Sequence, residues 1–555
     1  MSTRQRKKKE KQRRHGRSAA RRRLAAGAGL GIGASIALAA TAQADTFTVD
    51  TLNDTPTGTC PTPTSCSLRQ AVYSANLTTP SDDVVFAAGL SGTITLDYGY
   101  LAVDHPIHVF GPGPGQITVD GNDNERIFSI FTASGGEEVL IDGLTLANGY
   151  ANGFNGGGIG IGGAGAGPDV TISNSVVSGS DSLGSYGDGG AIAVYVGTLT
   201  VQSSTLTGNS AAGSGGAIFS YGSDLTIENS TIADNHALNF GGGGVYSGDD
   251  SMTIRNSTIY DNTAVNYHGG GVEAFGTNAT IESSTISGNT ANYGAGLSSN
   301  NNVYFTTMSL VDTIVADNTA SVAYPNVRGS FDAAFSLIEG PDPVNETVPG
   351  SNITGQDPQL GPLASNGGPT QTQALSTTSP AVDKGSLSGT DQRGQPRPFD
   401  FPSTPNSTAA GANGADIGAF ELQPPPPPGA PAAAAPKCKG KAATVFRPNG
   451  RTLTGTNKRD VIVGTKKKDK INSRGGNDLV CAKGGNDTVN GGGGKDKLYG
   501  QGGKDKLKGA GGNDKLVGGA KKDKLVGGPG KDKLLGKGGN DTCIGGPGVD
   551  VTKSC

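Results

Sequence analysis

The sequence predicts an all-β protein, in which a right-handed parallel β-helix is followed by a C-terminal parallel β-roll. Two kinds of internal repeat lead to this prediction: segments of about 27 residues in the middle of the chain, and nonapeptides near its end. The composition agrees, because glycine accounts for 92 of 555 residues, tryptophan is absent and aromatic residues make up 5%. Short strands with small residues at their corners suit this composition better than a core of large aromatic side chains.

The middle of the chain repeats one short pattern, seen in LTVQSSTLTGN, LTIENSTIADN, MTIRNSTIYDN and ATIESSTISGN. The closing residues Asn209, Asn235, Asn262 and Asn289 are 26, 27 and 27 residues apart. Apolar residues alternate within each copy, as they do in strands, and a glycine-rich corner follows. This period is too short for a unit that contains a helix, so it predicts one turn of a parallel coil with three short strands. The right-handed assignment rests on the general chirality of parallel crossovers.

Stacked turns place equivalent residues above one another. We therefore expect interior aliphatic columns formed by Ile227, Ile254 and Ile281 and by Ile232, Ile259 and Ile286. We also expect the side chains of Asn229 and Asn256, which fall in register, to form a hydrogen-bonded ladder.

The N-terminus has the three parts of an export signal. A basic stretch ending in ARRRLAA precedes the apolar LAAGAGLGIGASIALAA, and AQA follows. These features predict a signal peptide over residues 1–44, cleavage before Asp45, and a secreted or cell-surface protein. The paired arginines leave the twin-arginine route open beside the general one. The sequence predicts no integral membrane segment in the mature chain, because no second apolar stretch follows.

Charge is unevenly distributed along the chain, although the formal net charge is only -3. Residues 1–44 and 451–555 each carry +11, and residues 45–450 carry -25. An acidic body of this length argues against nucleic acid as a partner. A polysaccharide or cell-wall polymer is the expected partner, and the oligomeric state is not predicted.

Six cysteines agree with an oxidising destination. Cys60 and Cys66 are expected to close a small loop. In the tail, pairing of Cys438 with Cys481 and of Cys543 with Cys555 is the simplest of three possible connectivities.

A proline- and alanine-rich linker over residues 423–436 separates the body from the nonapeptide region at residues 437–555. In that region an aspartate recurs every nine residues, and most are followed two residues later by an aliphatic side chain. The aspartates are Asp460, Asp469, Asp478, Asp487, Asp496, Asp505, Asp514, Asp523, Asp532, Asp541 and Asp550.

Units such as GGGGKDKLY and GGPGKDKLL resemble the G-G-x-G-x-D-x-U-x nonapeptides of RTX, or haemolysin-type, proteins. The resemblance implies a β-roll in which two nonapeptides form one turn, and in which Ca2+ binds to aspartate and glycine-loop oxygens. It implies that folding is at least partly coupled to the metal. The residues expected at the calcium sites are Asp478, Asp487, Asp496, Asp505, Asp514, Asp532, Asp541, Asp550, Gly491, Gly494, Gly500, Gly503, Gly509, Gly512, Gly527 and Gly530.

Abundant lysine distinguishes this tail from the RTX pattern. Five lysines directly follow aspartates and should point to solvent, where their charge weakens calcium binding: Lys497, Lys506, Lys515, Lys524 and Lys533. Asp460, Asp469 and Asp523 are doubtful ligands, because their loops lack glycines that the pattern requires. The alternative is a roll that folds through its leucine column and disulfides, with lysines neutralising the aspartates.

Two further resemblances cover the body. TFTVDTLNDTPTGTCPTPTSCSLRQAVYSAN resembles the start of CSLREA-domain proteins, with Gln70 in place of the usual acid, and implies a cap over residues 45–100. DPQLGPLASNGGPTQTQALSTTSPAVDKG and ADIGAFEL resemble the end of the choice-of-anchor Q family, and imply a C-terminal part of the β-helix at residues 346–422. Residues 101–345 are then the β-helix repeats. These families imply a secreted bacterial protein and no single activity.

The predicted function is that of a calcium-binding surface or extracellular protein, adhesin-like or a binding scaffold. One alternative is a polysaccharide lyase or glycoside hydrolase, since such chemistry occurs on β-helices and needs clustered carboxylates or a basic partner. The residues considered for it are Asp120, Asp123, Asp188, Asp234, Asp261, Arg255 and His268. Asp234 and Asp261 recur at the same repeat position, which is typical of corner residues. Another alternative is a purely structural surface-layer component. Tyr195, Tyr246 and Tyr293 are candidates to stack on sugars.

Overall fold

A computed structural model describes most of the chain from Ala44 to Cys555. The described residues are 44–56, 58–60, 65–78, 81–132, 135–184, 187–249, 251–300, 308–340, 342, 344–401, 404–423, 437–445, 452–455 and 459–555. The predicted signal peptide, except Ala44, and the predicted linker, except Gln423, lie outside them. No helix among the described residues is long and apolar enough to cross a membrane.

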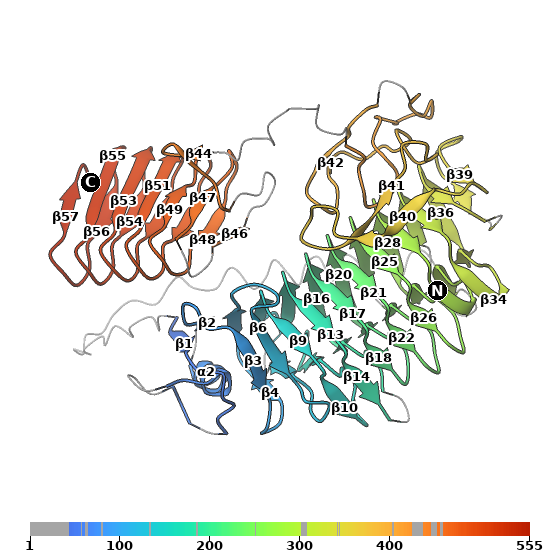
Figure 1. The fold of residues 1–555 in the computed structure, drawn as a ribbon, viewed down its shortest axis with the longest axis horizontal. Helices are drawn as coiled ribbons and strands as arrows, with labels where there is room; N and C mark the ends of the chain where they lie inside the picture. Colours follow the sequence, from blue (N-terminus) through green and yellow to red (C-terminus); the bar gives the residue numbers. More distant parts are fainter. Residues whose placement is uncertain are drawn as a thin grey trace, which may run out of the picture. The chain divides into compact units, whose positions relative to one another are not determined.

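The body is a coil of parallel strands in four sheets (Figure 1). Sheet A contains β1 (Thr46–Val49), β2 (Asp82–Phe86), β5 (Ile107–Phe110), β8 (Glu138–Asp142), β12 (Asp169–Ser173), β16 (Gly197–Gln202), β20 (Ser223–Glu228), β24 (Ser251–Arg255), β28 (Asn278–Glu282), β32 (Met308–Val311), β36 (Phe331–Ala334) and β38 (Asn345–Glu346). Sheet B contains β3 (Gly92–Thr95), β6 (Ile117–Asp120), β9 (Thr145–Ala147), β13 (Val176–Ser178), β17 (Thr205–Thr207), β21 (Thr231–Ala233), β25 (Thr258–Tyr260), β29 (Thr285–Ser287), β33 (Ile314–Ala316), β37 (Leu337–Ile338) and β39 (Ile353–Thr354).

The other two sheets complete each turn. Sheet C contains β4 (Leu101–Val103), β7 (Phe128–Thr132), β11 (Ile159–Gly163), β15 (Ile192–Val194), β19 (Ile218–Tyr221), β23 (Val245–Gly248), β27 (Val272–Phe275), β31 (Leu297–Asn300) and β35 (Val327–Arg328). Sheet D contains β10 (Tyr150–Asn152), β14 (Asp181–Leu183), β18 (Ser210–Ala211), β22 (His236–Ala237), β26 (Thr263–Ala264), β30 (Thr290–Tyr293) and β34 (Thr319–Ala323). A full turn therefore has four strands, in the order A, B, D, C, and not the three that were predicted. Sheet D was missed because several of its strands have only two residues.

Register pairing confirms both predicted aliphatic columns. Ile227 pairs with Ile254 and Ile254 with Ile281, while Ile232 pairs with Ile259 and Ile259 with Ile286. All six side chains are fully buried in one continuous core. Their burial supplies the main stabilisation of the coil, at about 25 cal/mol per Å² of apolar surface.

The predicted asparagine ladder exists, but in a different column. Asn229 and Asn256 adopt positive φ values of 53° and 46°, as corner residues do, so the prediction for them was wrong. The ladder is formed by the buried closing residues: the Asn235 side-chain amide donates to Asn262 Oδ1 at 2.8 Å, and that of Asn262 to Asn289 Oδ1 at 3.0 Å. The ladder satisfies polar groups at the inner corner between sheets B and D.

A single described helix, α2 (Leu68–Ala75), lies at the N-terminal end of the coil and packs against β1, β2 and β4. Ser67 and Gln70 form a reciprocal capping box: the Ser67 N–H donates to Gln70 Oε1 at 3.1 Å, and the Gln70 N–H donates to Ser67 Oγ at 3.3 Å. Gln70 thus performs at the helix N-terminus the role that a carboxylate has in a capping box. A disulfide joins Cys60 to Cys66, as expected.

After β39 the chain leaves the coil and folds back over the outer face of sheet B. This covering segment, residues 358–422, includes two antiparallel pairs: β40 (Leu360–Ala364) with β41 (Thr372–Leu375), and β42 (Gly389–Thr390) with β43 (Pro396–Arg397). The side chain of Gln392 accepts from Thr258 Oγ1 at 2.6 Å and donates to the Ser230 carbonyl at 3.1 Å. Successive turns of sheet B are therefore tied together from outside.

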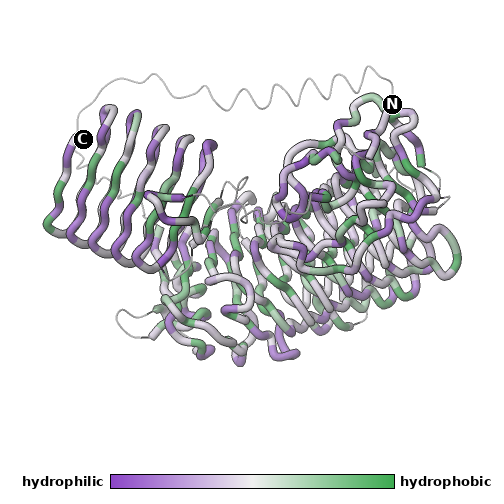
Figure 2. Tube along the Cα trace, turned by 45° about the horizontal axis from the view of Figure 1, so that its top comes forward, coloured by the Kyte–Doolittle hydropathy of each residue, from purple (hydrophilic) through white to green (hydrophobic). Residues whose placement is uncertain are grey.

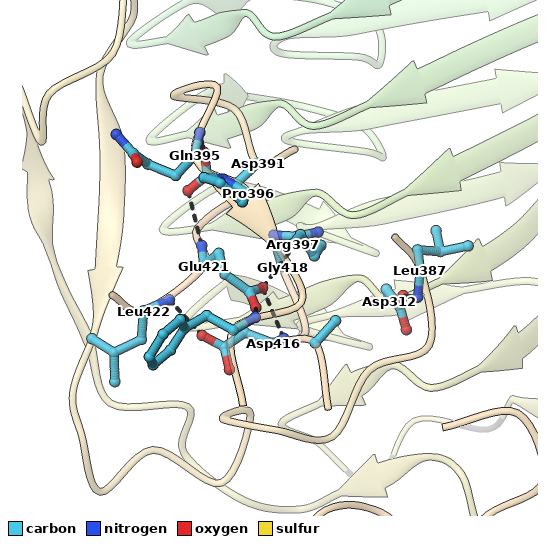
Figure 3. A network of polar contacts seen from close by, with 12 residues as sticks. Asp312, Leu387, Asp391, Gln395, Pro396, Arg397, Asp416, Gly418, Glu421 and Leu422 are labelled. Atoms are coloured by element: carbon cyan, nitrogen blue, oxygen red, sulfur yellow. Dashed lines mark hydrogen bonds and ion pairs between the residues drawn. The ribbon is translucent and has the colours of Figure 1, made fainter. Parts of the chain in front are cut away.

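A buried network of charges holds the covering segment together (Figure 3). The Arg397 guanidinium lies 3.0 Å from Glu421 Oε2 and donates to the Gly418 carbonyl at 2.7 Å. Glu421 Oε2 also accepts the Asp416 N–H at 2.9 Å. Burial raises the pKa of Glu421 to about 8 and that of Asp416 to about 6, even though Arg397 opposes both shifts.

The C-terminal region is a roll of two parallel sheets. Roll sheet 1 contains β47 (Val461–Val463), β49 (Leu479–Cys481), β51 (Lys497–Gly502), β53 (Lys515–Ala520), β55 (Lys533–Gly538) and β57 (Val551–Lys553). Roll sheet 2 contains β46 (Thr452–Thr454), β48 (Lys470–Asn472), β50 (Thr488–Asn490), β52 (Lys506–Lys508), β54 (Lys524–Val526) and β56 (Thr542–Ile544). Each strand contributes one inward aliphatic residue in most turns, and together these form a narrow core. Hydrophobic and hydrophilic residues alternate along the stacked turns (Figure 2).

A hairpin of β44 (Lys437–Cys438) and β45 (Lys441–Ala442) packs on the outer face of the first strands of roll sheet 1. The Cys438–Cys481 disulfide fixes this hairpin, and Cys543–Cys555 closes the last turn. Both pairings are the ones expected as simplest.

Candidate calcium sites and the outer face of the β-helix

The roll aspartates form two files, each at the start of the strands of one roll sheet. Asp478, Asp496 and Asp514 lead into β49, β51 and β53, while Asp487 and Asp505 lead into β50 and β52. Aspartates 18 residues apart are therefore neighbours in one file, one strand spacing of about 4.8 Å apart. The nine-residue period alternates between the two files.

Most roll carboxylates use one oxygen in the file and leave the other without a described hydrogen-bond partner. The Asp478 N–H donates to Asp496 Oδ1 at 2.8 Å, and the Asp496 N–H donates to Asp514 Oδ1 at 2.9 Å. The second oxygen, Oδ2, is buried and has no hydrogen-bond partner among the described residues at eight positions. These are Asp478, Asp487, Asp496, Asp505, Asp514, Asp523, Asp532 and Asp541. A buried, unsatisfied carboxylate oxygen is destabilising unless a cation or a proton occupies it.

Glycines surround these oxygens because a side chain would not fit. A Cβ on Gly491 would lie 2.7 Å from Asp496 Oδ2 and 2.8 Å from the Gly509 carbonyl oxygen, and Gly500, Gly509 and Gly527 are equivalent. At Gly494, Gly503, Gly512 and Gly530, φ lies between 125° and 144°, and a Cβ would overlap a carbonyl oxygen of the preceding turn. The predicted glycines thus lie where loop carbonyls and carboxylates approach closely.

This donor set fits calcium, a hard cation that takes six to eight oxygen ligands. Within the described part of the chain, no three side chains of the His, Cys, Asp and Glu types gather around one point. Loop carbonyls would therefore have to supply most of the coordination shell, with the Oδ2 atoms providing the charge.

The electrostatics of the files favour neutralisation. Burial raises the pKa of Asp496 to about 8, and the neighbouring carboxylates of Asp478 and Asp514 add to that rise. Burial likewise raises the pKa values of Asp478 and Asp487 to about 7, and those of Asp514 and Asp523 to about 6. Without a cation, the files retain protons near neutral pH.

The three aspartates that the sequence makes doubtful differ from one another. Asp523 has the same free Oδ2 as its neighbours, so Lys521, in place of a glycine, does not alter the carboxylate. Asp469 Oδ2 instead accepts the Thr465 N–H at 2.6 Å and its hydroxyl at 3.0 Å. Asp460 Oδ1 accepts the Thr444 hydroxyl at 3.1 Å. At the other end, half-buried Asp550 accepts the Asp532 N–H through Oδ1 at 2.8 Å.

The roll lysines lie on the outer faces, as predicted. Lys497, Lys506, Lys524 and Lys533 are exposed, and Lys515 is half-buried. Inward leucines alternate with them along the strands.

In the β-helix, most residues considered for catalysis form turns or ion pairs that stabilise the fold. Asp234 and Asp261 have positive φ values of 59° and 54° and are corner residues. Arg255 Nε lies 2.8 Å from Glu282 Oε2 on the surface. His268 Nδ1 lies 3.6 Å from buried Glu273, whose pKa is raised by burial. Asp120 Oδ1 accepts the Asn122 N–H at 2.9 Å, and Asp123 lies in the same corner with a φ of 50°.

Asp188 lies in different surroundings, beside a pocket of about 310 Å³ on the outer face of sheet C. Arg126, Asn155 and Tyr195 line this pocket, and the Asn155 side chain contacts the Tyr195 hydroxyl. Burial raises the pKa of Asp188 to about 6. Arg126 donates to the carbonyls of Gly156 at 3.0 Å and Asn155 at 2.6 Å, and no described carboxylate forms an ion pair with it.

An aromatic cluster extends from this pocket across successive turns of sheet C. The ring centroids of Tyr195 and Phe219 are 5.4 Å apart, and Phe219 stacks on Tyr246 at 5.2 Å. Tyr195 and Tyr221 are exposed. Tyr293 lies further along, with its ring 5.5 Å from that of His268. Arg126, Asn155 and Phe219 were missed from the sequence, although outward alternation in the sheet C strands marks Phe219.

Comparison with known proteins identifies the two regions. Residues 115–263 and 157–326 match the right handed beta helix region, and residues 454–489, 482–516 and 517–551 match the RTX calcium-binding nonapeptide repeat. The chain thus contains a right-handed parallel β-helix followed by RTX repeats of the calcium-binding type. No curated protein matches the chain significantly.

Two solved structures are weakly similar. The pectate lyase Pel9A is 15% identical, with a TM-score of 0.36, and the match covers 69% of this chain and 97% of that one. The PL6 family alginate lyase AlyGC is 10% identical, with a TM-score of 0.26, and the match covers 90% and 81%. At these TM-scores the likeness supports no conclusion about activity.

Proposed function

We propose that this chain is an extracellular calcium-binding protein, in which the roll binds Ca2+ between successive loops and the β-helix is a scaffold that binds a ligand. The observation that carries the calcium proposal is the set of eight buried Oδ2 atoms without a described partner. In the absence of metal these oxygens need protons, whereas calcium satisfies them and removes the repulsion within each file.

Calcium would be held by the aspartate files and the glycine-loop carbonyls. It would supply charge neutralisation and crosslinking of adjacent turns, because each loop lies against the loop 18 residues away. The lysines on the outer faces reduce the affinity through screened repulsion without occupying ligand positions.

Calorimetric titration of the full chain with calcium tests this proposal, with circular dichroism as a second readout. Heat of binding and a rise in the melting temperature of the roll at millimolar calcium are expected. The absence of both would favour the alternative, a roll that folds through its leucine core and disulfides alone.

For the β-helix, the aromatic cluster on sheet C favours glycan binding. The exposed rings of Tyr195 and Tyr221, which pack on buried Phe219, suit the apolar faces of sugar rings. Arg126 offers a positive charge without a described carboxylate partner. The same proposal includes a secreted or surface location. It also includes kinship of residues 45–100 with CSLREA-domain proteins and of residues 346–422 with choice-of-anchor Q proteins.

Substitution of Tyr195, which is exposed and lines the pocket, by alanine should abolish binding of the glycans that the chain retains on a glycan array. Substitution of Phe240, an aromatic residue outside this cluster, is the control. The lyase or hydrolase alternative predicts release of unsaturated or reducing ends from such glycans, with turnover lost on Asp188→Asn. Binding without turnover supports the scaffold.

A further inference from the structure

The outer face of roll sheet 1 carries two adjacent columns of side chains of different character. Lys497 pairs in register with Lys515, and Lys515 with Lys533, so three lysines form one column at strand spacing, about 4.8 Å. Two residues further along the same strands, a second column consists of Tyr499, Val517 and Leu535. Both columns point away from the inward leucines of the roll core.

The β44–β45 hairpin extends the positive column at one end. It packs on the same outer face and brings Lys439 to within 4.7 Å of the Tyr499 ring centre. A pocket of about 450 Å³ lies there. Five cationic residues line it, Lys439, Lys441, Arg459, Lys495 and Lys497, together with Tyr499 and one acidic residue, Asp478.

The cations of this face have no carboxylate partner among the described residues. No carboxylate oxygen in that part of the chain forms an ion pair within 4.0 Å with Lys439, Lys441, Arg459, Lys495, Lys497, Lys515 or Lys533. The roll aspartates are buried, and their Oδ1 atoms accept backbone N–H groups of the neighbouring turn. Like charges opposite one another on neighbouring strands are destabilising, so this face favours a ligand that brings negative charge at the same repeat.

We propose that this face binds a linear anionic polysaccharide with one carboxylate on each ring, running along the roll across the strands. The lysine column holds the carboxylates, since the length of a pyranose ring is close to the strand spacing. In the apolar column, half-buried Tyr499 and Leu535 receive the C–H faces of the rings, with buried Val517 packed between them.

The second column discriminates between polyanions. A polyphosphate has no apolar surface to place on Tyr499, Val517 and Leu535. Single-stranded nucleic acid binds on successive aromatic side chains, and this face has only Tyr499. The observations therefore favour a polysaccharide over either.

Roll sheet 2 offers a matched control within the same chain. Its outward positions also hold lysines, Lys470, Lys506 and Lys524, in register with one another through Thr488. The adjacent column there is polar at Asn472, Asn490 and Lys508 and becomes apolar only at its end, at Val526 and Ile544. The two faces thus carry three column lysines each, but only on roll sheet 1 does an apolar residue follow two positions after every one of them.

Calcium should strengthen this interaction, and this part of the inference rests on the proposed calcium sites. Bound calcium makes the roll more positive, so it favours a polyanion, and by thermodynamic reciprocity the polyanion favours calcium. The binding face itself consists of side chains that are not calcium ligands.

The test is amine-reactive labelling of the full chain, disulfides intact and calcium present, with and without oligogalacturonate, read by mass spectrometry. Labelling of Lys497, Lys515 and Lys533 should fall severalfold, while that of Lys470, Lys506 and Lys524 stays unchanged. The triple substitution K497Q/K515Q/K533Q should weaken binding roughly tenfold, as expected for three partly screened ion pairs. K470Q/K506Q/K524Q removes the same charge and should have less than about a twofold effect.

Equal protection of both lysine sets, or equal loss in both triple variants, would overturn the proposal in favour of diffuse electrostatics. Equally strong protection by polyphosphate or single-stranded DNA would also overturn the proposal. The Y499A substitution should weaken binding of oligogalacturonate but leave binding of polyphosphate and single-stranded DNA unchanged. Calcium heat is measured in the same sample without glycan. Protection of Lys497, Lys515 and Lys533 without any heat of calcium binding would refute the calcium sites but support the polysaccharide face. Heat of calcium binding without that protection would support the calcium sites and refute the polysaccharide face.

Discussion

The backbone N–H of Asp496 donates to Oδ1 of Asp514 at 2.9 Å, across one strand spacing of the roll. Each such bond fixes a carboxylate from the next turn while leaving its Oδ2 buried and without a described partner. The bond aligns successive turns of the roll, but it leaves an electrostatic penalty at Oδ2 that a cation would relieve.

Calcium binding should release protons. Because burial raises the pKa of Asp496 to about 8 and that of Asp478 to about 7, these groups are partly protonated at pH 7, and calcium requires the carboxylates. Calorimetry in two buffers of different ionisation enthalpy measures the release, which should shrink at pH 9. D496N should lower the calcium stoichiometry and the proton release. D469N is the control, because Thr465 already occupies its Oδ2.

The calcium-free roll should become less stable as pH rises. Burial raises the pKa of seven of its aspartates, those from Asp478 to Asp532, above the usual value near 3.9, so the folded state binds more protons and their contribution is full only below about pH 4. It is lost as pH rises through the folded values of about 6 to 8. The melting temperature of the roll transition in a chelator should therefore fall between pH 4 and pH 8. With saturating calcium the loss should disappear, and a calcium-free roll equally stable at both pH values would contradict this account.

Removal of one ladder amide should destabilise the β-helix. N262A removes the acceptor of the Asn235 backbone N–H at 3.1 Å and the amide that donates to Asn289 Oδ1 at 3.0 Å, whereas the Asn235 side-chain amide keeps the Leu206 and Ala233 carbonyls. Buried groups left unsatisfied are destabilising by about 1–3 kcal/mol each. The free energy of opening of the neighbouring turns, measured by hydrogen exchange, should fall by about 2–4 kcal/mol. N256G is the control, with a change within about 0.5 kcal/mol, because glycine accepts the positive φ there. A larger loss of stability for N256G than for N262A would indicate that the ladder runs through Asn229 and Asn256, as the sequence predicted.

The buried and exposed arginine–glutamate pairs should differ strongly. R397M leaves Glu421 buried and unpaired, and should lower the free energy of unfolding of the covering segment by about 3–5 kcal/mol. R255M breaks the surface pair with Glu282, and should change it by about 0–1 kcal/mol. Limited proteolysis after β39 reports release of the covering segment. Equal resistance of both variants would show that Arg397 contributes no more than a surface residue.

Periodicity predicted the interior columns, since Ile227, Ile254 and Ile281 share one phase of the repeat. It could not decide between two asparagines with the same 27-residue period, because the choice depends on which residue takes the positive φ at the corner. Asn256 turns outward there, and Asn262 turns inward. Sheet D was not predicted, since a pair such as His236–Ala237 is too short to show alternation.

In the roll, a strict nine-residue register predicted the aspartate positions but not their surroundings. Glycine content made Asp523 doubtful, yet its Oδ2 lacks a described partner like those of its neighbours, because its Oδ1 is fixed by the Asp505 N–H of the preceding turn rather than by Lys521. The pocket beside Arg126 was not foreseen, because residues from different turns and without any repeat form it. Long-range assembly of that kind leaves no local pattern.

The asparagine ladder has a direction: every side-chain amide from Asn209 to Asn289 donates toward the C-terminal neighbour. A turn that begins and ends in this ladder is an interchangeable module, with the same donor on one side and the same acceptor on the other. Gain or loss of a whole module by recombination would join matching surfaces, whereas gain or loss of half a module would oppose two unlike ones. The length of the rod can therefore evolve in steps of one turn, independently of its two ends.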